Sequence, residues 1–371
     1  MSILLKRSQA RVHRLILMTL AVSALPAAAR AQQGRIVVSA DQRGFVSVES
    51  GEPFVPWGFN YDHDGAGRLI EDYWDAEWGT VEEDFREMRA LGANVARVHL
   101  QFGRFMTSAV EPNQATLRQL ERLVALAERE SLYLDLTGLG CYHKSDVPAW
   151  YDGLDEQQRW AAQARFWEAI AGTCADSPAI FAYDLMNEPV VPGGDKPQSN
   201  WLGPAFGDKH FVQFITRDRA GRARPEIAKA WIHELVAAIR RYDQQHLVTV
   251  GLVPWSLDRP GLTSGFVPQQ VAGDLDFVAV HLYPESGKVE EALETLNGFD
   301  VGKPVVIEEM FPLKCSAEEL ETFIEKSRET AGGWIGFYWG TMPDETTSPK
   351  TIGEAITRRW LSLFRRRPHE A

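Results

Sequence analysis

Short apolar runs and helical apolar stripes alternate along most of this chain. From Phe54 onward eight apolar runs have the length of a strand, and most are separated by stretches with apolar residues at helical spacing. The later runs are apolar almost throughout, which is typical of parallel strands covered on both faces. The predicted strands are Phe54 to Asn60, Asn94 to Leu100, Leu132 to Leu136, Ala179 to Leu185, Leu247 to Val250, Phe277 to Leu282, Val305 to Ile307 and Trp334 to Trp339.

Helices are predicted in most of the intervals between these strands. Gly92 is expected to end the first helix as a C-cap, and Pro225 to begin another where its missing N–H costs nothing. The predicted helices are Val81 to Leu91, Ala115 to Arg129, Asp155 to Ala175, the one beginning at Pro225, Val289 to Leu296, Ala317 to Thr330 and Ile352 to Phe364. A long insertion, Val190 to Arg224, follows the fourth strand.

This alternation predicts an α/β fold with a parallel sheet. Eight repeats favour a single (β/α)8 TIM barrel over an open doubly wound sheet, and Arg35 to Glu52 adds a short N-terminal β-hairpin. A dinucleotide site is not expected, since no Gly-x-Gly-x-x-Gly follows the first strand.

The first 31 residues are predicted to be a secretory signal peptide. Basic residues precede the apolar stretch Leu15 to Ala29, and Ala29-Arg-Ala31 fits a small-x-small cleavage site. Residues 32–371 would then form one catalytic domain in a secreted or periplasmic protein. The alternative is an uncleaved N-terminal anchor, for which the apolar stretch is short.

Net charge limits the partners of residues 32–371. Of the 39 Lys and Arg, five lie in the first 31 residues, which leaves 34 against 51 Asp and Glu, a net charge of −17. Such an acidic surface opposes binding to nucleic acid or to an anionic membrane and suits a neutral substrate. A soluble monomer is expected. The three cysteines match no metal-binding spacing and are interpreted as small buried residues.

Two glutamates stand where buried strands end. Glu188 lies in Asp184-Leu-Met-Asn-Glu-Pro189, after the fourth strand, and Glu309 lies in Pro304-Val-Val-Ile-Glu-Glu-Met310, after the seventh. Catalytic groups of such barrels gather at the carboxyl ends of the strands, so the two carboxylates are expected to face each other across the mouth. Paired carboxylates on either side of a sugar ring are the groups that glycoside hydrolysis requires.

Other polar or aromatic residues at the strand ends complete a candidate site. Arg97 is expected to keep a nucleophilic carboxylate ionised, and Tyr283 to donate to the same group. Asn187 can bond a sugar 2-hydroxyl, and Trp339 offers a flat face for the ring. The predicted substrate-binding residues are Asn60, Arg97, Asn187, His281, Tyr283 and Trp339.

The order of these residues resembles glycoside hydrolase family 5. Asn187-Glu-Pro189, the strand-end Glu309, Arg97, His281-Leu-Tyr283 and Trp339 carry the resemblance, which spans roughly Phe54 to Phe364. It implies that Glu188 is the acid/base and Glu309 the nucleophile of a retaining β-glycosidase that uses no cofactor or metal. The implied substrate is a β-linked glucan or mannan.

The chain departs from the family pattern after the nucleophile. Phe-Gly commonly follows it, whereas Met310-Phe311 follows Glu309 here, and the preceding Glu308 is a rival nucleophile. Period-2 alternation places Ile307 and Glu309 on one side, which favours Glu309 and turns Glu308 toward the helix layer or a salt bridge.

Several alternatives stay open. The protein can be a non-catalytic carbohydrate-binding barrel, an exo-acting β-glycosidase on short oligosaccharides, or a metal-dependent barrel hydrolase, although no His/Asp ligand cluster is convincing. The cluster Asp62-His-Asp64 is interpreted as a solvated turn rather than a metal site. Core packing and sugar stacking are equally consistent with each of Trp57, Trp150, Trp201 and Trp255.

Overall fold

The computed structural model describes residues 33–371 except 195, 260, 346–347 and 367–371. The predicted signal peptide therefore lies outside the described residues. No helix in the described part of the chain is both long and apolar enough to cross a membrane.

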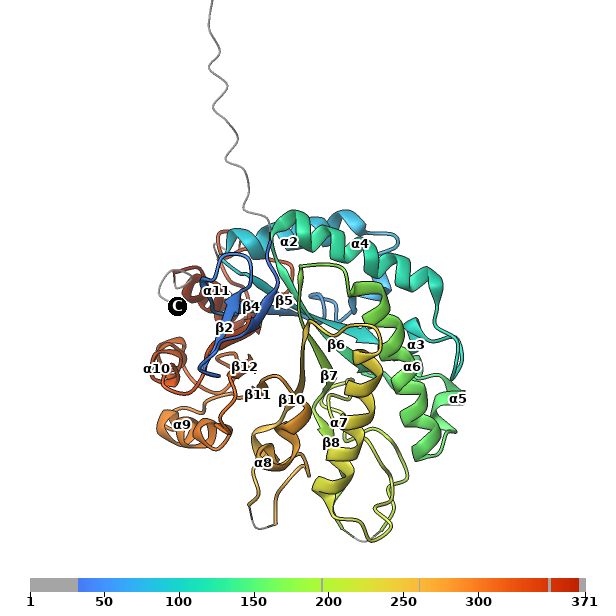
Figure 1. The fold of residues 1–371 in the computed structure, drawn as a ribbon. Coiled ribbons are helices and arrows are strands. Elements are labelled where there is room, and N and C mark those ends of the chain that lie inside the picture. The colour runs from blue at the N-terminus through green and yellow to red at the C-terminus, as the bar shows by residue number, and fades with distance from the viewer. Residues whose placement is uncertain (1–32, 195, 260, 346–347, 367–371) are drawn as a thin grey trace, which may run out of the picture. The chain divides into compact units, whose positions relative to one another are not determined.

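Eight parallel strands form a closed barrel, which confirms the predicted fold (Figure 1). Each strand hydrogen-bonds to its neighbours, and the last one, β13, closes the barrel against the first, β4. In chain order the barrel strands are β4 (Trp57–Tyr61), β5 (Val95–Gln101), β6 (Tyr133–Gly140), β7 (Ile180–Asn187), β10 (Leu247–Leu252), β11 (Val278–His281), β12 (Val305–Glu309) and β13 (Gly333–Phe337).

The predicted helices are present and surround the barrel. Gly92 follows the first of them at φ +97°, as expected of a glycine that ends a helix, and Pro225 lies in the first turn of another. The surrounding helices are α2 (Trp78–Ala90), α4 (Gln114–Glu130), α6 (Glu156–Cys174), α7 (Arg224–Arg240), α9 (Val289–Asn297), α10 (Ala317–Ser327) and α11 (Ile352–Arg366).

Short elements occupy several of the loops. The interval between β10 and β11 contains only one turn of α-helix and two 3-10 turns in place of a long helix. The short elements are α1 (Ile70–Tyr73), α3 (Phe102–Phe105), η1 (Lys144–Asp146), α5 (Ala149–Asp152), η2 (Pro254–Ser256), α8 (Pro268–Val271) and η3 (Ala272–Asp274).

The N-terminal hairpin covers the amino-terminal end of the barrel. It consists of the antiparallel strands β1 (Ile36–Val38), β2 (Phe45–Ser47) and β3 (Pro53–Phe54). The Phe45 ring meets Phe181 and Phe277 edge-on, with centroids 5.1 and 5.4 Å apart. These rings belong to an apolar cluster that includes residues from most barrel strands, so the hairpin plugs this end of the barrel.

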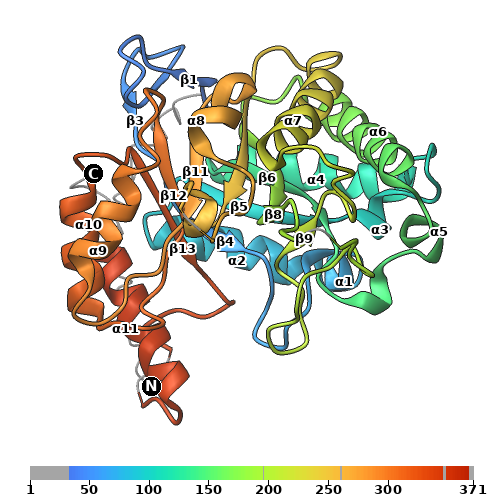
Figure 2. The same ribbon diagram turned by 90° about the horizontal axis from the view of Figure 1, so that it is seen from below.

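The insertion after β7 lies at the opposite end from the hairpin, as Figure 2 shows. It contains β8 (Pro189–Val190) and β9 (Gln213–Phe214), which pair in parallel. We call residues 196–213 the arch. Trp201 of the arch is 2% exposed, and the Arg159 and Arg217 guanidinium groups lie 4.5 and 4.9 Å from the centre of its ring. Trp201 is therefore a packing residue, as is buried Trp57, which stacks on Phe364.

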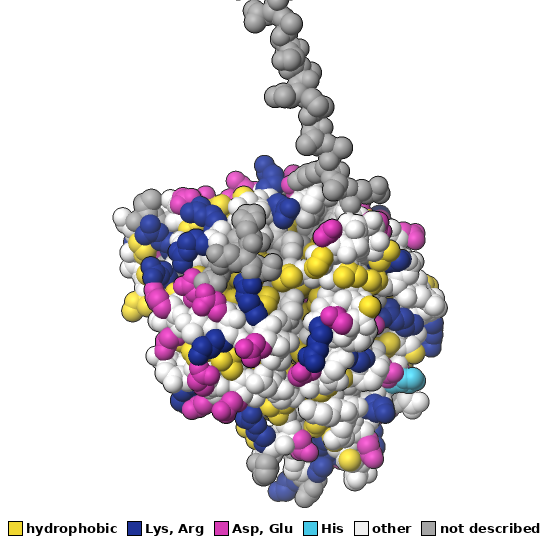
Figure 3. Space-filling view, turned by 60° about the vertical axis from the view of Figure 1, so that its left-hand side comes forward, with side chains coloured by type: hydrophobic (Ala, Val, Ile, Leu, Met, Phe, Trp, Pro, Cys, Tyr) yellow, Lys and Arg dark blue, Asp and Glu magenta, His cyan; other side chains and the backbone are white. Residues whose placement is uncertain are grey.

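The outer surface mixes charges of both signs. On the face seen in Figure 3, acidic and basic side chains are interspersed. Neighbouring helices exchange ion pairs, such as Lys326 of α10 with Glu290 of α9 and Arg359 of α11 with Glu318 of α10. The three cysteines are unpaired: Cys141 and Cys174 are buried, as expected, whereas Cys315 is only partly buried.

Candidate active site

Glu188 adopts a strained backbone conformation at the barrel mouth. It follows the last residue of β7 and has a φ of +48°, in the left-handed region that disfavours a residue with a Cβ. Its N–H donates to the Gly251 carbonyl at 3.0 Å, which ties the turn to β10. Such strain costs on the order of 1–3 kcal/mol and is concentrated at functional sites. The side chain remains 17% exposed.

Glu309, at the end of β12, receives two strong hydrogen bonds. Tyr283 donates to its Oε2 at 2.6 Å and Arg97 Nη1 to its Oε1 at 2.9 Å. Burial nevertheless raises the pKa of Glu309 above its ordinary value, and His281 and Arg97 lower it only in part. Arg97 thus favours the ionised form of Glu309, as expected, but burial has the larger effect on the pKa.

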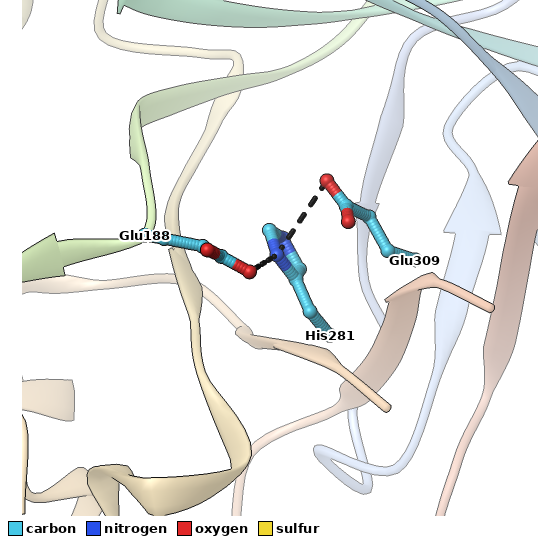
Figure 4. A group of neighbouring side chains, drawn as sticks. All are labelled: Glu188, His281 and Glu309. Carbon is cyan, nitrogen blue, oxygen red and sulfur yellow. Dashed lines mark hydrogen bonds and ion pairs between the residues drawn. The ribbon is translucent and has the colours of Figure 1, made fainter. Parts of the chain in front are cut away.

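His281, the last residue of β11, lies between the two glutamates (Figure 4). Its Nδ1 is 3.0 Å from Glu188 Oε1 and 3.5 Å from Glu309 Oε1. Burial lowers the pKa of His281, but Glu309, Glu188 and Glu308 outweigh burial and raise it to about 10. One ligand atom from each of these three side chains lies within 4.8 Å of the other two, a spacing that a cation can occupy. An imidazolium has no free lone pair for a metal, so at neutral pH this donor set does not suit one.

The spacing of the two glutamates is short. An oxygen of Glu188 and an oxygen of Glu309 lie within 4.8 Å of each other. Carboxyl groups about 5 Å apart accompany retention in glycosidases, while inversion requires about 6.5–9.5 Å to admit a water.

Arg97 links most of the predicted site residues beneath the mouth. It is fully buried, and its Nη2 donates to Asp184 at 2.7 Å and to Asn187 Oδ1 at 3.1 Å. Its Nη1 also donates to Asn60 Oδ1 at 2.8 Å. Asn60 uses its amide donors on the Glu308 and Gly336 carbonyls and is itself fully buried. Asn60 therefore lies below the other predicted residues, as a tie between strands.

Glu308 is turned into the barrel interior. Its carboxylate lies 3.5 Å from Arg97 Nε and 3.6 Å from His281 Nε2, and it is fully buried. The predicted salt bridge of Glu308 is confirmed, whereas the alternative prediction, that Glu308 faces the helix layer, is wrong. Strict alternation does not hold here, because the register between β11 and β12 shifts. Val280 pairs with Ile307, but the next residue, His281, pairs with Glu309, so Glu308 is an extra residue without a partner position in β11.

Two more carboxyl groups that were not predicted from the sequence lie in this buried layer. Asp135 of β6 and Asp184 of β7 are both fully buried below Glu309. Burial raises the pKa of Asp135 far above its ordinary value, and the charges of Glu308 and Asp184 add to that effect. Burial opposes ionisation of Glu308 too, but Arg97 and His281 outweigh it and lower its pKa. An ionisable residue inside an apolar strand run was the signal that could have revealed Asp135.

Aromatic side chains line the mouth beside Glu309. Trp339, partly buried after β13, stacks on Phe337 at 5.5 Å with an interplanar angle of 12°. Trp339 also borders a cavity of about 630 Å³ lined by polar residues of the segment after β13. Tyr142, which the sequence analysis also missed, contacts His99 Nδ1 through its hydroxyl. Trp255 lies on the far side of Tyr283 and borders a second cavity, of about 240 Å³.

The Asp62-His-Asp64 cluster divides into two parts. Asp64 accepts from the Ala66 and Arg68 N–H groups at 2.9 Å, which confirms a turn. Asp62 is instead only 7% exposed, and its carboxylate lies 2.8 Å from His63 Nδ1. The prediction that Asp62 belongs to a solvated turn is therefore wrong.

Comparison with known proteins agrees with this architecture. The family model for cellulase (glycosyl hydrolase family 5) matches residues 49–341. The chain therefore belongs to glycosyl hydrolase family 5, and the predicted class of protein, a glycoside hydrolase, is confirmed.

Similar sequences include fungal mannanases. Mannan endo-1,4-beta-mannosidase A of Podospora anserina is 23% identical over 275 residues, which cover 65% of this chain and 63% of that protein. Probable mannan endo-1,4-beta-mannosidase C of Aspergillus terreus is 30% identical over 192 residues, 47% of this chain and 43% of that one. The chain thus matches less than two thirds of the length of these relatives.

Solved structures share the fold. An exo-beta-1,4-mannosidase from Opitutaceae bacterium strain TAV5 superposes with a TM-score of 0.66 at 16% identity, covering 90% of this chain and 62% of that one. The beta-mannanase of the blue mussel Mytilus edulis gives 0.60 at 17% identity, covering 90% and 97%.

Proposed function

We propose that this protein is a secreted, retaining β-glycosidase that hydrolyses β-1,4-linked mannan or a related glucan by double displacement. The observation that carries the proposal is the short spacing of Glu188 and Glu309, whose nearest oxygens lie within 4.8 Å. The mannanases among the similar sequences favour mannan over glucan.

In the first step the Glu309 carboxylate bonds to the anomeric carbon. The bond from that carbon to the leaving oxygen breaks as Glu188 protonates this oxygen, which leaves a glycosyl ester on Glu309. Tyr283 and Arg97 hold one oxygen each of Glu309, so they orient the carboxylate for attack.

In the second step Glu188, now ionised, takes a proton from water. The water oxygen bonds to the anomeric carbon and Glu309 is released, so two inversions give net retention. His281 remains within hydrogen-bond distance of Glu188 and holds its carboxyl in place for both transfers. Trp339 supplies an apolar face for the ring.

The anomeric configuration of the first-formed product tests this mechanism. Proton NMR during hydrolysis of an aryl β-mannoside or a β-1,4-mannooligosaccharide is expected to show the β-anomer first, with the α-anomer arising later by mutarotation. First appearance of the α-anomer would establish inversion and exclude Glu309 as a nucleophile. Binding of oligosaccharide with no product at all would instead favour the carbohydrate-binding barrel.

A further inference from the structure

The arch reaches across one side of the barrel mouth. From β7 it passes the loop after β6, where the His210 N–H donates to the Tyr142 carbonyl at 2.8 Å. It continues to the loop after β4, where Lys209 Nζ lies 3.8 Å from the point that a Cβ on Gly67 would occupy. Figure 2 shows the arch beside the loop after β4. The arch therefore spans the mouth on the side of β4 and β6, which we call the closed side.

Lys209, near the tip of the arch, is buried without a partner. It is only 7% exposed, and no described residue accepts a hydrogen bond from its ammonium group or pairs with it within 4.0 Å. Burial lowers the pKa of Lys209, and the charge of Asp62 is the largest effect that raises it. The Lys209 stem is buried, whereas its ammonium nitrogen is not among the fully buried atoms that lack a partner, so the group is available to a ligand.

Asp62 stands at the catalytic end of the barrel, because it directly follows the last residue of β4. Its charge acts on the pKa values of Lys209, His99 and Tyr283. His63, paired with Asp62, lies 6.1 Å from Trp339 ring to ring. Asp62 is thus linked through His63 to Trp339, the proposed apolar face for the sugar.

The other side of the mouth is open. The cavity of about 240 Å³ beyond Tyr283 is lined by loops after β10 and β11, including Trp255 and Arg259. Glu188, the proposed proton donor, leans toward this side through its hydrogen bond with His281 of β11. The leaving group therefore departs over β10 and β11, and the closed side receives the far end of the cleaved sugar.

We propose that Lys209 and Asp62 bind the hydroxyl groups of the non-reducing terminal sugar, so that the enzyme acts from chain ends and releases single sugars. The proposal rests on the proposed function. A neutral sugar fits better than an anionic one, because the negative charges of Asp62, Asp208 and Asp64 act on Lys209 and would repel an anion. Hydroxyl groups can accept from the ammonium group and donate to the Asp62 carboxylate.

The products released from β-1,4-mannopentaose labelled at its reducing end test this proposal. At low conversion the wild-type enzyme is expected to yield only mannose and labelled tetramer. Early release of labelled dimer or trimer would overturn exo action while leaving the glycosidase mechanism intact. A wild-type protein that hydrolyses no β-mannoside or β-glucoside would overturn both proposals.

Lys209→Ala should raise KM for an aryl β-mannoside about 10- to 100-fold, with a smaller change in kcat, because a charge-assisted hydrogen bond to substrate is lost. Lys196→Ala is the matched control, since Lys196 is an exposed lysine of the same arch. An unchanged KM in a folded Lys209→Ala variant would remove Lys209 from the sugar site.

A shortened arch tests the closure itself. The backbone of Gly203 lies beside that of Val212, because the Gly203 N–H donates to the Val212 carbonyl at 2.9 Å, so Asn-Gly can replace residues 204–211 as a hairpin turn. This variant should gain internal cleavage of mannopentaose. A folded, active variant that still releases only mannose would show that the arch does not set the exo pattern.

Discussion

The two ends of the barrel are formed by the same eight strands but have opposite chemistry. At the amino-terminal end, Phe45 of the hairpin packs against Phe181 and Phe277 in a closed apolar cluster. At the carboxyl-terminal end, Glu188 and Glu309 face each other around a charged histidine. The first arrangement stabilises the fold through burial, whereas the second holds charged groups and a strained residue at the proposed site. We therefore expect stability and activity to depend on different ends of the barrel.

Glu309→Ala should abolish turnover, with a loss on the order of 10⁴-fold or more in kcat, because the proposed glycosyl ester cannot form. Its thermal midpoint should stay close to that of the wild type: Glu309 also pairs with Arg97 and His281, but burial outweighs these contacts and raises its pKa, whereas the pKa of Glu308 is lowered. Hydrolysis of an aryl glycoside and thermal unfolding measure the two effects. The control is Glu290→Ala on the surface helix α9, and substantial activity in Glu309→Ala would refute the assignment.

Phe45→Ala should have the reverse effect, a loss of stability with little loss of activity. Loss of a ring that is 2% exposed should lower the free energy of unfolding by about 3–5 kcal/mol and leave kcat/KM nearly unchanged. Urea unfolding and aryl-glycoside kinetics are the measurements. Val48→Ala is the control in the same hairpin, because Val48 is 47% exposed. A large loss of activity in folded Phe45→Ala would contradict the separation of the two ends.

Glu308 and Asp135, two buried acids between the two ends, are expected to differ in their contribution to stability. Glu308→Gln should cost about 3 kcal/mol or more of stability, because Arg97 and His281 lose a buried counter-charge. Asp135→Asn should cost less than about 1 kcal/mol, since burial and the charges of Glu308 and Asp184 raise the pKa of Asp135 and favour the neutral acid that the amide replaces. Urea unfolding of both variants at neutral pH tests the difference, and equal losses would contradict the assigned protonation states.

The last expected effect is a pH dependence of stability. The pKa of His281 is 6.5 in the unfolded chain and about 10 in the folded protein. The folded state therefore holds a proton that the unfolded state has lost, and this stabilising contribution, complete below pH 6.5, declines as the pH rises through 10. Urea unfolding between pH 6 and pH 10 should show a decline that His281→Gln reduces. Replacing exposed His233 with Gln should leave the decline unchanged.

The local pattern of apolar and polar residues was sufficient to predict most of the fold. The eight apolar runs and the helical stripes predicted the barrel, and their order alone placed Glu188 after the fourth strand and Glu309 after the seventh. Arg97, His281 and Tyr283 were predicted on the same basis and lie around the two glutamates. Whether these residues carry out the proposed roles remains a prediction.

Details that depend on contacts far apart in the chain did not follow from pattern. Alternation could not reveal the register shift at Glu308, because one extra residue reverses the faces of a strand without changing its composition. The plug formed by Phe45 and the buried position of Lys209 arise from segments that meet only after the barrel closes. The sequence by itself determined the barrel and which carboxylates stand at its strand ends. The tertiary structure alone decided which carboxylate reaches the mouth, which ones stay buried, and which side of the mouth is closed.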